Sequence, residues 1–112
     1  MIRRTALCFF VIAIMAGSLA LAADAPSVSA AEATFKAKCT MCHGPDGGGK
    51  TMMGEKLNIR DMRSEEVQKQ SDADINGIIT NGKGKMSPYK GKLSDEQIAQ
   101  LVTYIRELGK KK

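Results

Sequence analysis

Two cysteines and a histidine stand close together in the segment Cys39-Thr40-Met41-Cys42-His43. On a helix, positions i, i+3 and i+4 share one face, so Cys39, Cys42 and His43 can all face one flat ligand. The two thiols can form thioether bonds to the vinyl groups of a haem, and the imidazole can bind its iron. The pattern C-x-x-C-H is typical of c-type haem attachment. We therefore predict one covalently bound haem c per chain.

Three other uses of these side chains are less consistent with the sequence. A zinc site takes about four ligands, whereas the chain has three cysteines and one histidine, and Cys8 lies in a segment expected to be removed. A thioredoxin-like redox motif needs a βαβ setting, which the sequence pattern lacks. A disulfide between Cys39 and Cys42 would close a very short loop and leave His43 without a role.

Residues 1–23 have the pattern of a secretory signal peptide. Two arginines precede an apolar run over residues 6–16, and an A-x-A-like cleavage sequence ends at Ala22. Cleavage near Ala22 or Ala23 would place the mature chain in the periplasm, and haem attachment after export fits the thioether chemistry. An uncleaved membrane anchor is the alternative, but the apolar run is short for a membrane span.

Length and charge limit what the mature chain can be. The 112 residues suffice for one small domain. We expect a flexible leader over residues 24–30, rich in Pro, Ser and Ala, and a haem-binding domain over residues 31–110. Removing Arg3 and Arg4 with the signal peptide leaves 15 basic against 12 acidic residues, a net charge of +3. A nucleic-acid-binding domain would carry a strong basic stripe, so we expect no nucleic-acid partner.

Hydrophobic periodicity predicts an all-α fold of about four helices whose loops wrap around the haem. The first helix covers residues 31–42, with Phe35 on the face of the cysteines, and Ser64 and Ser71 each begin a short helix. The second of these carries the stripe Ile75, Ile78 and Ile79 and stops at Asn81-Gly82. The last helix covers residues 93–109, with a capping box at its start and one apolar stripe: Ile98, Leu101, Val102, Ile105 and Leu108.

The sequence predicts loops in three segments. The Gly-rich segment 44–49 ends the first helix. Residues 51–62 show no apolar period, and we expect them to run along the haem with Leu57 and Ile59 facing inward. Two glycines and a proline exclude regular structure over residues 83–92. A chain this short has a small core, so we expect it to be poorly folded without haem.

The second axial ligand of the iron is sought among the methionines, because His43 is the sole histidine of the sequence. Thioether ligation is a common alternative in cytochromes, and the candidates are Met41, Met52, Met53, Met62 and Met86. Met41 lies on the attachment segment itself. Met86 follows His43 by 43 residues and a helix, which gives the chain room to pass around the haem. We predict Met86, with Met62 or an open or water-bound site as alternatives.

The order of these features resembles the class I monohaem c-type cytochromes of bacteria over residues 31–109. The resemblance rests on the haem motif followed by glycine, on Asn-Gly-Lys-Gly-Lys-Met-x-Pro-Tyr over residues 81–89, and on Leu-Val-x-Tyr-Ile over residues 101–105. It implies covalent attachment at Cys39 and Cys42, His43 as proximal ligand and Met86 as distal ligand. It also implies that the helix of Phe35 crosses the last helix near Tyr104. Members often have proline directly after the ligand methionine, whereas here Ser87 precedes Pro88.

An iron with both axial positions filled offers substrate no coordination site, so the predicted function is one-electron transfer between redox partners of a respiratory or related chain, not catalysis. We expect a monomer without a membrane span in its mature form. Lysines flank Met86 and either steer acidic partners or simply face solvent: Lys83, Lys85, Lys90 and Lys92. The rival functions are a haem-based sensor with a labile Met86 and a subunit of a larger redox complex.

Overall fold

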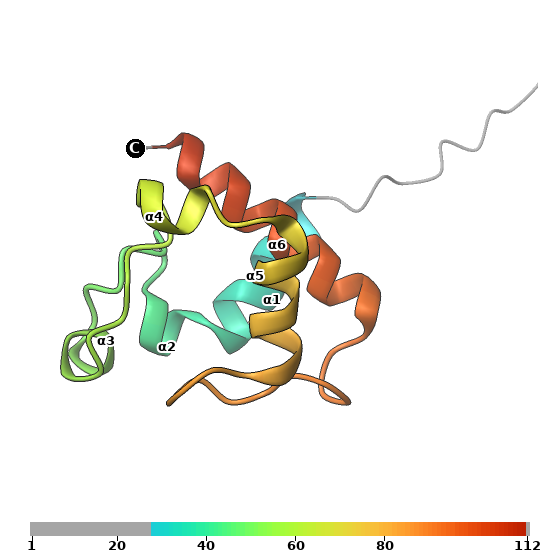
Figure 1. Cartoon of the computed structure of the whole chain (residues 1–112), viewed down its shortest axis with the longest axis horizontal. Helices are drawn as coiled ribbons and strands as arrows, with labels where there is room; N and C mark the ends of the chain where they lie inside the picture. Colours follow the sequence, from blue (N-terminus) through green and yellow to red (C-terminus); the bar gives the residue numbers. More distant parts are fainter. Residues whose placement is uncertain (1–27, 112) are drawn as a thin grey trace, which may run out of the picture.

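The computed structural model describes residues 28–111. The predicted signal peptide and the first four residues of the predicted leader lie outside the described residues. The described part forms six helices, in the order α1 (Val28–Lys38), α2 (Thr40–His43), α3 (Met52–Lys56), α4 (Glu65–Gln68), α5 (Asp72–Asn81) and α6 (Asp95–Lys110) (Figure 1). The predicted all-α class is confirmed. Six helices replace the expected four, and three of them, α1, α5 and α6, are substantial.

Helix α6 begins where its sequence signals place it. The Ser94 side chain accepts a hydrogen bond from the backbone N–H of Gln97 at 3.1 Å, and the Gln97 side chain accepts one from the N–H of Ser94 at 2.9 Å. This reciprocal pair is the predicted capping box. The apolar residues share one face of the helix and are buried: Ile98, Leu101, Val102, Tyr104, Ile105 and Leu108.

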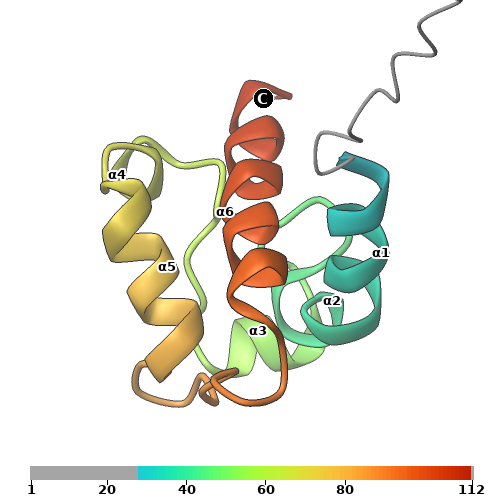
Figure 2. The same ribbon diagram turned by 90° about the vertical axis from the view of Figure 1, so that its right-hand side faces the viewer.

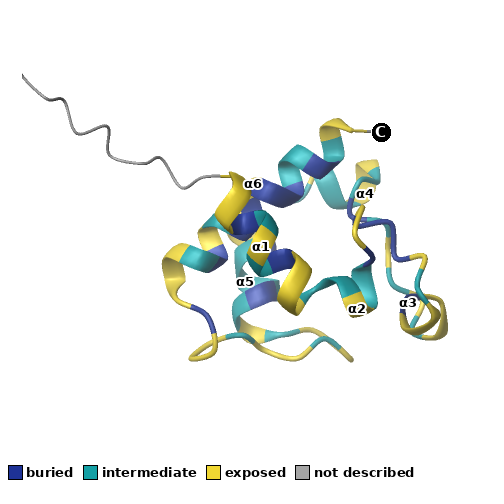
Figure 3. Ribbon diagram, turned by 180° about the vertical axis from the view of Figure 1, so that it is seen from behind, coloured by how far each residue is buried: buried dark blue, intermediate teal, exposed yellow. Residues whose placement is uncertain are grey.

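Helix α6 lies between α1 on one side and α5 on the other (Figure 2). Phe35 of α1 is 0% exposed, and its ring centroid lies 5.1 Å from that of Tyr104, with 55° between the ring planes. Tilted aromatic pairs at this distance are favourable beyond the area they bury. The predicted crossing of the two helices is therefore confirmed, and both rings belong to the buried core. Buried segments of both helices are dark blue in Figure 3.

The helix predicted over residues 31–42 starts earlier than expected, and the structure divides it at Cys39. The N–H of Cys42 donates to the carbonyl of Cys39 at 3.3 Å, which tightens the turn there. The hydroxyl of Thr40 donates to the carbonyl of Lys36 at 2.8 Å. Threonine hydroxyls that bond a carbonyl one turn back bend helices. The division places Cys42 and His43 on a short helix of their own, α2, with Cys39 as its N-cap.

The segment over residues 51–62 contains helix α3, where the sequence predicts a loop. Thr51 caps this helix, since its hydroxyl oxygen accepts a hydrogen bond from the N–H of Gly54 at 2.8 Å. The buried residue of α3 is Gly54. A helix that is buried through a glycine has no apolar side chain at its contact, so hydrophobic periodicity does not reveal it.

Helices α4 and α5 have the predicted serine caps. Ser64 accepts a hydrogen bond from the N–H of Val67 at 3.3 Å, and Ser71 accepts one from the N–H of Asp74 at 3.0 Å. Gly82 ends α5 with φ of +74°, a conformation that glycine adopts without strain.

The segment between α4 and α5 is fastened to α6 by Arg106. Its guanidinium donates to the carbonyl of Gln68 at 2.6 Å, to the carbonyl of Gln70 and to the carboxylate of Asp72 at 2.9 Å. These bonds hold the start of α5 in place.

Among the described helices, none combines the length and apolar character that crossing a membrane requires.

Candidate haem site

The three residues of the motif occupy α2 and the residue before it. Cys39 caps α2, while Cys42 and His43 form its last two positions, and all three side chains are partly buried. Both cysteines are free thiols. Burial raises the pKa of Cys39 to about 11 and lowers the pKa of His43. Burial of the imidazole thus favours its neutral form, which is the form that binds a metal.

The glycine-rich loop that follows is fixed against both neighbouring segments. The N–H of Gly49 donates to the carbonyl of His43 at 2.8 Å, and the N–H of Met62 donates to the carbonyl of Gly47 at 2.8 Å. At Gly47 φ is +74°, and a Cβ there would meet side chains of Leu108 and Met62 at 3.1–3.2 Å. Glycine is thus required by both conformation and space, and the tight loop orients the His43 end of α2.

Beside α2 lies a cavity of about 430 Å³ whose wall combines the motif with apolar side chains from five other segments. Leu57 and Ile59 line it, as the sequence predicts, and so do Ile75, Ile78 and Ile79 of α5. Ile75 and Ile79 also belong to the buried core, whereas Ile78 is partly exposed. The wall also includes residues that the sequence did not single out for the site: Val67, Gln70 and Ile105.

Met86 lines the same cavity from the segment between α5 and α6. Its N–H donates to the carbonyl of Lys83 at 2.9 Å, and the N–H of Lys83 donates to the carbonyl of Met86 at 3.1 Å. This closed turn uses Gly84, whose φ is +57°. Gly82 lies against the same turn, because a Cβ there would come 2.6 Å from the carbonyl oxygen of Met86. The backbone of Met86 is therefore held in one place.

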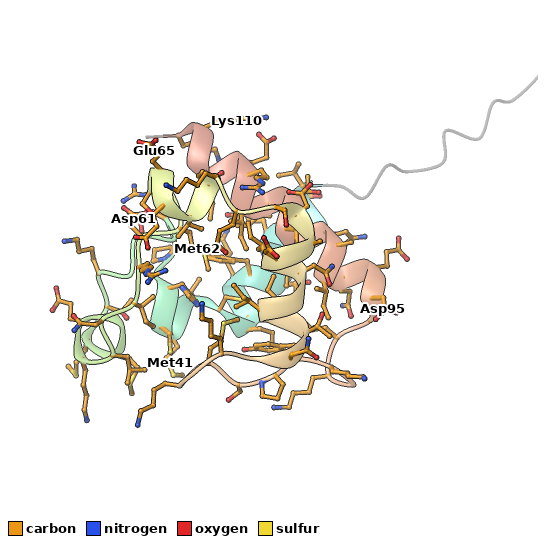
Figure 4. All side chains as sticks on the ribbon, in the orientation of Figure 1. Met41, Asp61, Met62, Glu65, Asp95 and Lys110 are labelled. Atoms are coloured by element: carbon orange, nitrogen blue, oxygen red, sulfur yellow. The ribbon has the colours of Figure 1, made fainter. Side chains whose placement is uncertain are left out.

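The other methionines are placed differently. Met41, at the outer edge of α2 (Figure 4), is 78% exposed, and Met52 is 90% exposed. Met53 is also exposed, and these three do not line the cavity. Met62 is buried between α2 and α4 and does line it, but its sulfur packs beside Gly47, where an added Cβ would lie 3.3 Å away. Met86 and Met62 are thus the two methionines that the fold brings to the motif.

The charges at the cavity are of one sign. The basic residues among its lining are Lys38, Arg60, Lys83 and Lys85, and no Asp or Glu lines it in the described part of the chain. An anionic ligand with an apolar body suits such a lining, because charged groups are stabilised beside opposite charges and apolar surface gains by burial. Haem, a flat apolar ring with two carboxylates, has these properties.

The polar atoms of the site are also consistent with a haem. Nδ1 of His43 is buried and has no hydrogen-bond partner in the structure, and buried polar atoms without partners are uncommon in folded proteins. Two thiols and an imidazole on α2 and the residue before it are the donor set for covalent haem and its iron. Among residues 28–111, no group of three or more His, Cys, Asp or Glu side chains is placed to hold a metal ion. The residues present therefore fit a haem.

An all-helical fold with a C-x-x-C-H helix beside an apolar, basic-lined cavity defines a small c-type cytochrome. Residues 26–105 match the family described as "Cytochrome C oxidase, cbb3-type, subunit III". The cytochrome c6 of Nostoc sp. (strain PCC 7120 / SAG 25.82 / UTEX 2576) is 38% identical over 93 residues, which cover 83% of this chain and 77% of that protein. The cytochrome c6 of Leptolyngbya boryana is 33% identical over 81 residues, covering 69% of this chain and 87% of that protein.

The fold has a solved counterpart. The structure named KustC0563 c-type cytochrome matches with a TM-score of 0.65 and 35% sequence identity, covering 70% of this chain and 95% of that one. The chain therefore belongs to the monohaem c-type cytochromes, as a domain of the cytochrome c6 and cbb3 subunit III type. It is a cytochrome c6-like electron carrier, and the prediction of electron transfer in place of catalysis is confirmed.

One contact at the edge of the site was not foreseen from the sequence. The hydroxyl of Tyr89 donates to the backbone carbonyl of Lys38 at 2.9 Å, across 51 residues of sequence. Both residues line the cavity. The sequence contains no signal for this bond, because a backbone carbonyl has the same chemistry at every position.

Proposed function

We propose that this chain is a periplasmic one-electron carrier with one haem c. In this proposal Cys39 and Cys42 form the thioether bonds, His43 is the proximal ligand and Met86 the distal ligand. The observation that carries the proposal is the shared cavity, which brings the motif and Met86 together from segments 43 residues apart. When bound, the haem supplies an iron that alternates between ferric and ferrous states.

The protein residues would favour electron transfer over chemistry at the iron. Two protein ligands leave no coordination position for a substrate. Thioether ligation raises the reduction potential, since it is the ligation type of high-potential cytochromes. The apolar residues Leu57, Ile59 and Ile78 would exclude water from the ring faces. Because Met86 is fixed by its closed turn, little rearrangement should accompany a change of charge at the iron.

Electron carriers exchange electrons with redox partners, and we infer that these partners present acidic surfaces. Four lysines near Met86 are exposed, namely Lys83, Lys85, Lys90 and Lys92. Two of them, Lys83 and Lys85, also line the cavity. Positive charge at the point where electrons leave would orient an acidic partner. The carrier would act as a monomer, with a signal peptide over residues 1–23, a leader over residues 24–30 and the haem domain over residues 31–110.

The ligand set is tested by two methionine variants of the haem-loaded protein. Met86→Ala should abolish the sulfur-to-iron charge-transfer absorption of the ferric protein and let carbon monoxide bind the ferrous protein readily. The matched control is Met62→Leu, which should keep the absorption. A spectroscopic redox titration of both variants should show a lower potential for Met86→Ala alone. The proposal is wrong if Met86→Ala keeps both the absorption and the potential of the parent protein.

A second candidate function is a subunit of a larger redox complex, because the matching family is described as subunit III of a cbb3-type oxidase. The two functions differ in how the protein behaves on extraction. A free carrier is released with the periplasmic fraction and elutes as a monomer of its own mass. A subunit would remain with other chains when membranes are extracted gently.

A further inference from the structure

We propose that Tyr89 is the residue that positions the Met86 turn against the haem motif, and that its hydroxyl is the group responsible. The proposal rests on the ligation by His43 and Met86 proposed above. Tyr89 lies three residues after Met86, and its hydroxyl reaches the carbonyl of Lys38, the residue directly before Cys39. One bond thus connects the two segments proposed to hold the iron.

The carbonyl of Lys38 accepts this bond because of the division of the first helix. In a continuous helix the N–H of Cys42 would donate to it. Here that N–H donates to the carbonyl of Cys39 instead, at 3.3 Å. The last carbonyls of any helix need partners from outside it. The hydroxyl of Tyr89 supplies such a partner at 2.9 Å.

The backbone of Tyr89 is also fixed by hydrogen bonds, so the bond from its hydroxyl holds two fixed segments together. The N–H of Tyr89 donates to the carbonyl of Ile79 in α5 at 3.0 Å, and its carbonyl accepts from Lys92 at 2.9 Å and Leu93 at 3.0 Å. The ring is partly buried and packs against the core. Tyr89 therefore joins α5, the end of α1 and the approach to α6.

The expected consequence of losing the hydroxyl is a Met86 turn that opens more easily. Tyr89→Phe keeps the ring and its packing and removes one hydrogen bond. Exogenous imidazole competes with the Met86 sulfur for ferric iron, so its apparent affinity reports how easily the turn opens. We expect Tyr89→Phe to bind imidazole about fivefold more tightly, the effect of one neutral hydrogen bond.

The matched control is Tyr104→Phe, the same change at the other tyrosine of the sequence. Tyr104 is buried on α6 against Phe35 and is not among the residues that line the cavity with Met86. Tyr104→Phe should leave imidazole affinity unchanged, whatever it does to the free energy of unfolding. Denaturant unfolding of each variant separates a general loss of stability from the specific effect on the turn.

The experiment distinguishes the two proposals. If the parent ferric protein lacks the sulfur-to-iron absorption, both the Met86 ligation and the role of Tyr89 are overturned. If the absorption is present and Tyr89→Phe binds imidazole as the parent does, the role of Tyr89 alone is overturned. An equal gain in Tyr104→Phe would also overturn it, since the effect would then follow general stability. A gain confined to Tyr89→Phe supports the proposal.

Discussion

The hydroxyl of Thr51 donates to the backbone carbonyl of Cys42 at 2.9 Å, while its oxygen accepts from the N–H of Gly54 at 2.8 Å. One side chain thus caps α3 and joins it to the last turn of α2. The position of α3 next to the haem motif follows from this bond and from Gly54, whose backbone lies against the carbonyls of Cys42 and Gly49. Helix α3 therefore supports the motif, although it contributes no apolar side chain at this contact.

Two glycine variants test this support. Gly54→Ala should destabilise the protein by about 1–3 kcal/mol, because its Cβ would overlap the carbonyl oxygens of Gly49 and Cys42. Gly77→Ala is the matched control, since it is also a helical glycine but has nothing within 4 Å of an added Cβ. It should stabilise the protein by about 0.5–1 kcal/mol. Denaturant unfolding of the haem-loaded variants measures both; equal effects at the two positions would contradict the packing.

Removing the haem tests how far the fold depends on it. The double variant Cys39→Ala, Cys42→Ala should give a chain with helical far-ultraviolet dichroism but without a sharp unfolding transition. The physical reason is that the side chains around the cavity of about 430 Å³ lose their contacts in the absence of the ring. Met41→Leu, in the same motif but 78% exposed, should retain haem and sharp unfolding. A cooperative transition in the haem-free double variant would refute this expectation.

Ionisation of Tyr89 should make the stability of the folded protein fall as the pH rises. Burial raises the pKa of Tyr89 above its ordinary value of 10.0. A group whose pKa is higher in the folded state contributes stability that is fully present below the unfolded pKa and is lost as pH rises through the folded pKa. The ionised oxygen also can no longer donate to the carbonyl of Lys38. The stability advantage of the parent over Tyr89→Phe should therefore shrink above about pH 10.

Urea unfolding of both proteins over about pH 8 to 11 measures this advantage. Taking the difference between the parent and Tyr89→Phe removes the contributions of the other titrating groups, which the two proteins share. An advantage that stays constant over the whole pH range would show that Tyr89 does not ionise with a shifted pKa.

The lysines near Met86 should influence the rate of electron transfer. Electron transfer to a small anionic iron complex should slow about threefold in the double variant Lys83→Ala, Lys85→Ala at low ionic strength. The difference should vanish at about 1 M salt, where the screening length is about 3 Å. Lys111→Ala, at the far end of α6, is the matched control and should react as the parent does. Stopped-flow kinetics with a cationic complex should show the reverse trend, and equal slowing with both complexes would argue against steering.

The haem-attachment motif of this protein is local in sequence, and so the sequence alone predicted it. Cys39, Cys42 and His43 lie within five consecutive residues, and their spacing is typical of covalent haem attachment. The serine caps at Ser64, Ser71 and Ser94 and the apolar stripe of α6 are equally local, because capping and amphipathicity act over one or two turns. Fold class, family and electron transfer follow from these features.

The placement of the parts was decided by the tertiary structure, because it depends on contacts between segments distant in sequence. The division of the first helix at Cys39, the existence of α3 and the bond from Tyr89 to Lys38 involve backbone carbonyls, which are chemically alike at every position. The same holds for which methionines reach the cavity. All five downstream of the leader have the same thioether, and only the packing brings Met62 and Met86 to the cavity while leaving Met41, Met52 and Met53 exposed.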